Sequence, residues 1–333
     1  MSDAKDVLKP LKTWSHLAGN RRRPSEYEIV SVNIHGSRSS LNDRPPFELS
    51  SDLPMNNWYR RYRNETPLTS ADWNAWRDPD ETTYRAYNIL QDGQETYVEG
   101  LLDEFSKREN DAGLDPEWLK VLARCYSPSR YPFHALQMAS AYVGQVAPAS
   151  TITNTCYFQA ADSLRLVSHT AYRTRELANR FPDSGFITGE RAEWEKDDCW
   201  QGFRELMERL LSTYDWSDSF IGLCLVAKPM IDECLLRRLG VAARRNGDTL
   251  LGMLTDAQLR DSDRAKRWTS SLVKFMAGEE GNTKRMQDYV NKWMPYAISA
   301  AKSYCSALPD GDEHAAAAIE AVGDFVRSCN LTV

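Results

Sequence analysis

The sequence predicts an all-α fold in which long helices form a bundle. After residue 80, apolar and aromatic residues recur at a spacing of three to four, which is typical of amphipathic helices. No run shows the period-two alternation of a half-buried strand. Two or three of the expected helices approach about 30 residues, against a usual mean of about 11–12. A long-helix bundle, of which the ferritin-like type is one, is therefore favoured over a packing of short helices.

The first 80 residues differ from the rest in composition. They hold seven of the fifteen prolines together with Trp14, Trp58, Trp73 and Trp76. Proline disfavours long helices, whereas a disordered tail is poor in aromatic residues. We therefore expect residues 1–80 to form an extended, aromatic-rich arm that is pinned to a surface, which can belong to another chain.

The first two helices of the body follow from periodicity and from the prolines. Apolar and aromatic residues recur at helical spacing over 81–108. The next helical stretch, 116–146, contains Pro128 and Pro132, which are expected to interrupt it. Its C-terminal part carries small residues that would allow a neighbouring helix to approach closely.

The third helix, 150–180, contains neither Gly nor Pro, and Ser150 or Thr151 can cap its N-terminus. The later helices are expected at 199–213, 216–239, 248–277, 282–307 and 314–327. We therefore expect one ferritin-like helical domain over 81–307 and a C-terminal turn with a short helix over 308–333.

Composition and charge exclude several classes of protein. The chain has 41 basic and 47 acidic residues and a net charge of -6, which argues against a nucleic-acid or anionic-membrane partner. Its seven cysteines form no C-x-x-C pair and show no zinc-like spacing to a histidine. The polar N-terminus is unlike a signal peptide, and the longest apolar run, 220–227, is too short to span a bilayer. These features predict a reduced, soluble, cytoplasmic protein.

A stripe of polar residues on the third helix raises the question of a metal site. At helical spacing it aligns Asp162, Arg165, His169, Arg173 and Glu176. A di-iron bundle needs a Glu-x-x-His pair on each of two helices. None of the five histidines has an acidic residue three positions before it, and residues 118–161 contain no Asp or Glu at all. We therefore expect no metal ligand and no catalytic residue in this chain.

The same stripe has a structural interpretation. Asp162 can pair with Arg165, and Arg173 with Glu176, because each pair is three residues apart. The apolar side of the helix is then the opposite one, and it carries Leu164, Val167, Ala171 and Ala178. His169 is expected to be a hydrogen-bonded helix histidine.

Two alternatives remain open from the residues alone. The first is a stand-alone, divergent di-iron oxidase with ligands drawn from Asp92, Glu95, Asp162, His169 and Asp232. The helix without acidic residues disfavours it, because the site would lack carboxylates. The second is a helical interaction protein unconnected to oxygen chemistry.

The sequence lacks the motifs of several other enzyme classes. No nucleophile elbow, phosphate-binding loop or dinucleotide fingerprint is present.

Several long segments resemble a known family. They include "LKTWSHLAGNRRRPSEYEIVS", "DWNAWRDPDETTYRAYNILQDGQETYVEGLLDEF", "ARCYSPSRYPFHALQMASAYVGQVAPASTI" and "ADSLRLVSHTAYRTRELA". The chain resembles the hydroxylase beta subunit of bacterial multicomponent di-iron monooxygenases nearly from end to end. The similarity is greatest to the branch that acts on toluene, o-xylene, alkenes or isoprene, although Glu81, Thr82 and Thr83 depart from the aromatic members.

The resemblance implies a ferritin-like subunit that lacks the di-iron ligands and is not itself catalytic. It implies a larger alpha subunit that carries the di-iron centre and a small gamma subunit, in a two-fold symmetric assembly. A coupling protein, a Rieske-type ferredoxin and an NADH reductase are the other implied partners. The implied substrates are alkenes such as isoprene, or toluene-type aromatics.

The resemblance also suggests what the aromatic arm binds. We expect five aromatic residues of the arm to contact the alpha subunit, because extended aromatic segments gain burial only against a partner or the parent domain. They are Trp14, Tyr27, Trp58, Tyr59 and Trp76. The alternative is that these rings pack on the helices of this chain.

Overall fold

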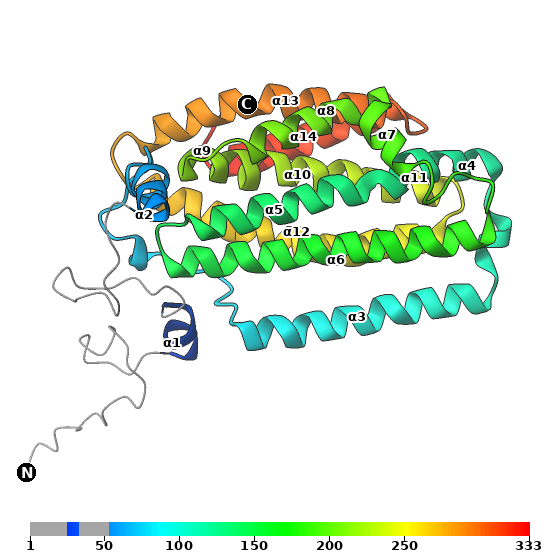
Figure 1. Cartoon of the computed structure of the whole chain (residues 1–333), viewed down its shortest axis with the longest axis horizontal. Coiled ribbons are helices and arrows are strands. Elements are labelled where there is room, and N and C mark those ends of the chain that lie inside the picture. Colours follow the sequence, from blue (N-terminus) through cyan, green and yellow to red (C-terminus); the bar gives the residue numbers. More distant parts are fainter. Residues whose placement is uncertain (1–24, 33–52) are drawn as a thin grey trace, which may run out of the picture.

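The computed structural model describes residues 25–32 and 53–333, and within them all regular structure is helical. Figure 1 shows the long helices lying side by side along the length of the molecule. The α-helices are α1 Glu26–Val32, α2 Pro54–Tyr59, α3 Tyr84–Lys107, α4 Pro116–Val121, α5 Arg130–Gln145, α6 Ser150–Arg180, α7 Glu190–Lys196, α8 Asp198–Leu211, α9 Trp216–Phe220, α10 Lys228–Ile231, α11 Leu239–Arg245, α12 Thr249–Met276, α13 Asn282–Cys305 and α14 Gly311–Ser328.

One continuous helix, 216–245, forms the centre of the body, and we call it the central helix. It joins α9, α10 and α11 through two π-helical segments, Ile221–Ala227 and Asp232–Arg238. Every side chain from 219 to 236 is buried. A helix that is covered on all sides in this way lies inside a protein. Its neighbours include α5, α8, α12, α13 and α14.

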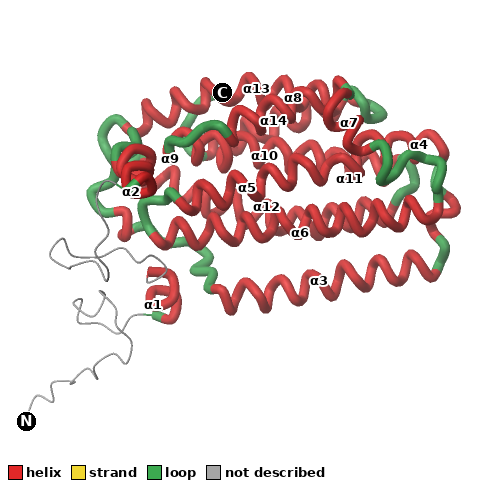
Figure 2. The backbone as a smooth tube through the Cα atoms, viewed as in Figure 1, coloured by secondary structure: helices red, strands yellow, loops and turns green. Residues whose placement is uncertain are grey.

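The other long helices pair around this centre. α5 packs along α6, α8 along α13, and α11 along α12. Figure 2 shows these helices joined by short loops. Gly144 of α5 allows a close approach, because a Cβ atom built on it would lie 2.9 Å from the Tyr157 ring of α6. The expected role of small residues in this stretch is therefore confirmed.

α3 lies apart from the rest, along the outer edge of the body (Figure 1). Four of its 24 residues are buried, namely Tyr87, Gln91, Gln94 and Val98. Two of these are glutamines, so the buried side of α3 is unusually polar. The helix contacts the body mainly through α12.

The predicted helices agree with the observed ones, with two local differences. Pro128 lies in a short 3₁₀ turn and Pro132 in the first turn of α5, where a missing N–H is tolerated. α6 begins at Ser150, and its N-cap position is Ala149, which makes no side-chain cap bond. The expected capping by Ser150 or Thr151 is therefore wrong. Within the described residues, no helix is long and apolar enough to cross a membrane.

Candidate functional site

A network of polar side chains connects α3 to α6 and α12, and we call it the polar joint. It consists of Tyr87, Gln91 and Glu95 from α3, Asp162, Arg165 and His169 from α6, and Asp261 and Arg264 from α12. On each helix these residues lie three or four apart, which places them on one side. The polar joint therefore fixes the N-terminal half of α3 through hydrogen bonds and ion pairs, whereas the C-terminal half packs on α12 through an apolar cluster around Val98 and Leu254.

Asp162 is at the centre of the polar joint. Its Oδ2 accepts a hydrogen bond of 2.6 Å from Arg264 Nη2, and its Oδ1 accepts bonds of 2.9 Å from the Tyr87 hydroxyl and 3.0 Å from Gln91 Nε2. Burial raises the pKa of Asp162 to about 6, and the nearby charge of Asp261 adds to this effect. The charge and hydrogen bond of Arg264 counteract it in part.

Arg165 and His169 of α6 bind Glu95, a residue of α3. Arg165 donates to Glu95 Oε1 at 2.6 Å and to Asp261 Oδ2 at 2.8 Å, and His169 Nε2 lies 3.0 Å from Glu95 Oε2. Burial alone would raise the pKa of Glu95, but the hydrogen bonds from His169 and Arg165 lower it below its ordinary value. His169 is thus hydrogen-bonded, as predicted.

The structure corrects one of the two predicted ion pairs on α6. Asp162 pairs with Arg264 of α12 and not with Arg165 of its own helix. The second pair is confirmed, because Arg173 Nη1 lies 3.2 Å from Glu176 Oε2. The first prediction was wrong because a residue on a neighbouring helix is closer to Asp162 than the one a turn away.

The orientation of α6 differs from the predicted one, because only Val167 and Ala178 of the predicted apolar side are partly buried against the core. Asp162 and Arg173 are buried, whereas Leu164 is 50% exposed and Ala171 is exposed. The polar side faces inward because α3 and α12 supply groups of opposite charge for it. Periodicity alone identifies two sides of a helix, but it does not decide which one faces a polar neighbour.

The described residues do not assemble the alternative di-iron site. Asp232 lies in the central helix, where Lys228 Nζ is 2.5 Å from its Oδ2 and both side chains are buried. The adjacent Glu233 is paired with Arg237 and Lys266. Asp162, Glu95 and His169 are engaged in the polar joint instead, and Asp92 is exposed. Nowhere in 25–32 or 53–333 do three or more His, Cys, Asp or Glu side chains form a group that could hold a metal ion.

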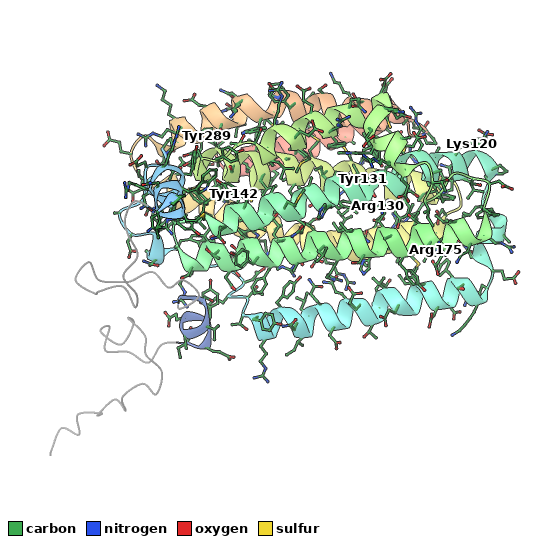
Figure 3. The ribbon with its side chains drawn as sticks, in the orientation of Figure 1. Lys120, Arg130, Tyr131, Tyr142, Arg175 and Tyr289 are labelled. Carbon is green, nitrogen blue, oxygen red and sulfur yellow. The ribbon has the colours of Figure 1, made fainter. Side chains whose placement is uncertain are left out.

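Four of the five predicted partner-binding residues lie in the described part of the chain, and α2 carries two of them. The Trp58 Nε1 donates to the Tyr142 hydroxyl at 3.2 Å, and its ring lies 5.0 Å from that of Tyr214. The Tyr59 hydroxyl accepts a hydrogen bond from Gln145. Figure 3 shows Tyr142 at the end of α5 that lies beside α2. Both α2 rings are half-buried and keep an exposed side.

The other two are buried within this chain. The Asp78 N–H donates to the Tyr27 hydroxyl at 3.1 Å, and the Trp76 Nε1 donates to Ser271 Oγ at 3.2 Å. Trp14 lies outside the described residues. Binding of a partner by these five residues stays a prediction. Among the described four, only Trp58 and Tyr59 keep an exposed side that a partner could contact.

The sequence did not single out four members of the polar joint, Tyr87, Gln91, Asp261 and Arg264. A signal was available in α12, where Asp261 and Arg264 lie three residues apart on a helix whose apolar residues predict burial. Oppositely charged residues on a buried side of a helix require partners. The partners of these residues lie up to 170 residues away in the sequence, so a local sequence pattern could not identify them.

Comparison with known proteins gives matches over most of the chain. Residues 58–280 match the family model described as methane/phenol/alkene hydroxylase. The beta subunit of the hydroxylase component of the toluene-4-monooxygenase system of Ectopseudomonas mendocina is 51% identical over 300 residues, which are 90% of this chain and 91% of that protein. An oxygenase component of phenol 2-monooxygenase from Pseudomonas sp. strain CF600 is 26% identical, with 71% of each chain covered.

Solved structures share the fold. A structure of toluene 4-monooxygenase with toluene bound in its resting active site matches with a TM-score of 0.84 and 50% identity, and covers 90% of this chain and 98% of that chain. Phenol hydroxylase from Pseudomonas sp. OX1 matches with a TM-score of 0.82 at 22% identity, covering 96% and 95%. The second likeness concerns the fold alone.

Proposed function

Because the chain belongs to the methane/phenol/alkene hydroxylase family, we propose that it is the non-catalytic beta subunit of the hydroxylase component of a di-iron monooxygenase. The observation that carries the non-catalytic role is the state of the buried carboxylates. Asp162, Asp232 and Glu233 are each neutralised by Arg or Lys. These residues do not fit a di-iron centre, because a cation already occupies the place that a metal would take beside each of them.

The proposed partners follow from the similarity to hydroxylase beta subunits. A larger alpha subunit would carry the di-iron centre, and a small gamma subunit would complete a two-fold symmetric assembly. A coupling protein, a Rieske-type ferredoxin and an NADH reductase would serve that assembly. All seven cysteines are free and buried, which fits a reducing compartment such as the cytoplasm.

The proposed substrates are small hydrocarbons. Toluene-type aromatics are favoured by the 51% identity to the toluene-4-monooxygenase subunit. Alkenes such as isoprene are the second candidate. In either case this chain acts by holding its partner in place, and the apolar packing around the central helix supplies the rigidity for that role.

Iron content tests the proposed function. The full chain is purified alone and, separately, after co-expression with the neighbouring oxygenase genes. We expect the lone chain to be free of iron and the complex to hold about two irons per protomer, as a di-iron bundle requires. Stoichiometric iron in the lone chain would refute the non-catalytic role, and Asp162→Asn would then identify whether the polar joint binds it.

Co-purification tests the proposed anchoring by the arm. Deletion of residues 2–60 removes Trp58 and Tyr59, and we expect it to weaken recovery of the alpha subunit with this chain. Tyr131→Ala is the matched control, because Tyr131 is a partly exposed aromatic residue at the opposite end of α5 (Figure 3). Equal recovery of alpha with the deletion and with the control would contradict the anchoring role.

A further inference from the structure

Four aromatic rings in successive contact connect the surface to the core at the end of the bundle where α5 begins. The rings of Tyr131 and Trp194 are stacked, with their centroids 5.7 Å apart. The Trp194 ring lies 5.7 Å from that of Trp200, and the Trp200 ring lies 5.0 Å from that of Tyr304. We call these four rings the aromatic line. They come from α5, α7, α8 and α13, so the packing of four helices brings them together.

Burial increases along the aromatic line. Tyr131 and Trp194 are half-buried, whereas Trp200 and Tyr304 are fully buried. Each of the two inner residues donates a hydrogen bond to a backbone carbonyl, at 2.8 Å for Trp200 Nε1 and 3.2 Å for the Tyr304 hydroxyl. These bonds fix the orientation of the inner rings. The aromatic line therefore has an outer end that a solute can reach and an inner end that it cannot.

The inner end lies among cysteine thiols. Cys305 follows Tyr304 in α13, and its Sγ lies 4.0 Å from Cys234 Sγ of the central helix. Burial raises the pKa of Tyr304 well above its ordinary value, and four neighbouring thiols add to this effect. They belong to Cys125, Cys199, Cys234 and Cys305.

The two closest of these thiols are protected from direct attack by dissolved oxidants. Both Cys234 and Cys305 are fully buried, and burial raises the pKa of Cys234 well above its ordinary value. Peroxide reacts with the thiolate form of an accessible cysteine, and neither condition is met here. Indole and phenol rings, in contrast, give up single electrons more readily than other side chains of a protein interior. Rings in contact therefore offer these thiols a path for electrons that does not require the oxidant to enter the core.

We propose that the aromatic line carries single electrons from the Cys234–Cys305 pair to the surface, so that the pair is an internal store of reducing equivalents. The oxidants that it would quench are radicals of the class that oxygen and peroxide form at a redox-active metal. Such a radical takes one electron from Trp194. That electron is replaced in turn by one from Trp200, from Tyr304 and from a thiol.

Two such events empty the store. In each, one thiol loses an electron and a proton and becomes a thiyl radical, and the two sulfur radicals then join in a disulfide bond. Two oxidant molecules are each reduced by one electron, and two protons are released. Cys305 donates its thiol hydrogen bond to the Cys234 sulfur, so both protons can leave through Cys234. The carboxylate of Glu233, the preceding residue of the central helix, accepts them and passes them to solvent.

This inference goes beyond the proposed function and concerns only residues of this chain. Its test measures the state of the thiols and rings, and neither iron content nor recovery of the alpha subunit enters it. It can therefore fail while the proposed function holds.

Oxidation from the surface tests the store in the full chain, within the complex that it forms on co-expression. The probe is photogenerated tris(bipyridine)ruthenium(III), with a cobalt(III) ammine as the electron acceptor, because this bulky cation cannot enter the core. Free thiols are blocked under denaturing conditions after illumination, and the Cys234–Cys305 disulfide is quantified by mass spectrometry of peptides. We expect the disulfide to form in the natural chain. Its absence would overturn the proposal.

Substitution of one outer ring tests the path. Trp194→Phe is expected to lower the yield of the disulfide several-fold, and the partly exposed position of Trp194 allows the variant to fold. Trp73→Phe is the matched control, because Trp73 is also half-buried and its ring lies 5.2 Å from that of the fully buried Trp216. Trp200→Phe tests the inner step in the same way. Equal yields for Trp194→Phe and Trp73→Phe would show that the oxidant reaches the thiols by another route, and would overturn the proposal.

Removal of one thiol tests whether the store protects the rings. In Cys305→Ala the electron taken from Trp194 is no longer replaced, so we expect oxygenated products of Trp194 to increase several-fold under the same illumination. Cys329→Ala is the control, since Cys329 is also buried but follows α14 and is not among the thiols around Tyr304. Oxidation of Trp194 that is the same in both variants would contradict the role of the thiols as the electron source.

Discussion

The central helix and α3 are both long helices of one bundle, but they are held in opposite ways. The central helix is buried along most of its length among apolar side chains, and its buried carboxylates are ion-paired, Asp232 with Lys228 of the same helix and Glu233 with Arg237 and with Lys266 of α12. α3 is attached through the polar joint and through a small apolar cluster around Val98, and it leaves Tyr84, Ile89 and other apolar residues exposed. The difference indicates that the central helix supplies much of the stability of this chain, whereas α3 contributes less of the buried apolar surface.

The largest expected effect is on the central helix. Phe220 is fully buried, with its ring 5.4 Å from that of Trp216 and 5.9 Å from that of Trp268. We expect Phe220→Ala to lower the free energy of unfolding by about 3–5 kcal/mol, because it leaves a cavity. Ile89→Ala on α3 is the contrasting change, with an expected effect within about 0.5 kcal/mol. Denaturant titration of both variants measures the difference, and equal effects would remove the distinction between the two regions.

Loss of one partner of the buried ion pair Lys228–Asp232 is expected to lower the free energy of unfolding almost as much. Asp232→Ala leaves Lys228 as a buried charge without its partner, and we expect a loss of about 3 kcal/mol. The double change Lys228→Met with Asp232→Leu removes both charges, and its expected cost is near zero. Thermal and denaturant unfolding of the two variants compare them. A double variant as unstable as the single one would show that the pair contributes packing that Met and Leu do not replace.

A third expectation concerns pH and the polar joint. The pKa of Asp162 is raised by burial from 3.8 to about 6, so the folded chain binds this proton more tightly than the unfolded chain. Its contribution to stability is therefore complete below about pH 4 and is lost as the pH rises through about 6. The free energy of unfolding of the natural chain, relative to Asp162→Asn, should fall by about 2–3 kcal/mol between pH 4 and pH 7. A relative stability that rises with pH would mean that Arg264 holds Asp162 as a carboxylate.

The smallest expected changes in stability come from replacing two glycines, Gly202 and Gly93, by alanine. A Cβ atom on Gly202 of α8 would lie 2.5 Å from Ala300 Cα of α13, so Gly202→Ala should destabilise the chain by about 1–3 kcal/mol. Gly93 of α3 has open space around it, and Gly93→Ala should stabilise the chain by roughly 0.5–1 kcal/mol. The two melting temperatures should therefore move in opposite directions. A decrease for Gly93→Ala would show that α3 is packed more tightly than its surroundings indicate.

The positions of the helices could be predicted because they depend on local patterns. Apolar periodicity located α3, the run without Gly or Pro located α6, and proline positions located the break before α5. The orientation of α6 could not be predicted in this way. Whether Asp162 faces water or a neighbouring helix depends on Arg264, which is 102 residues away.

The candidate site shows the same limit. The absence of a Glu-x-x-His pair could be read from the sequence, since that motif is local. The ion pairs of Asp162 with Arg264 and of Arg165 with Asp261 depend on how three helices pack together. The arm was predictable as a segment rich in aromatic residues, but the burial of Trp76 against Ser271 depends on a contact over 195 residues.

The two π-helical segments of the central helix bear on how chain length can change in this family. A π turn holds one residue more than an α turn, because its hydrogen bonds join residues five apart instead of four. Deletion of one residue from Ile221–Ala227 or Asp232–Arg238 can therefore convert that turn to α-helix and leave the flanking turns in phase. Deletion of one residue from the middle of α12 would instead rotate everything after it by about 100°. Insertions and deletions among relatives are thus expected to be tolerated in the π turns of the central helix and to be rare in the long α-helices that surround it.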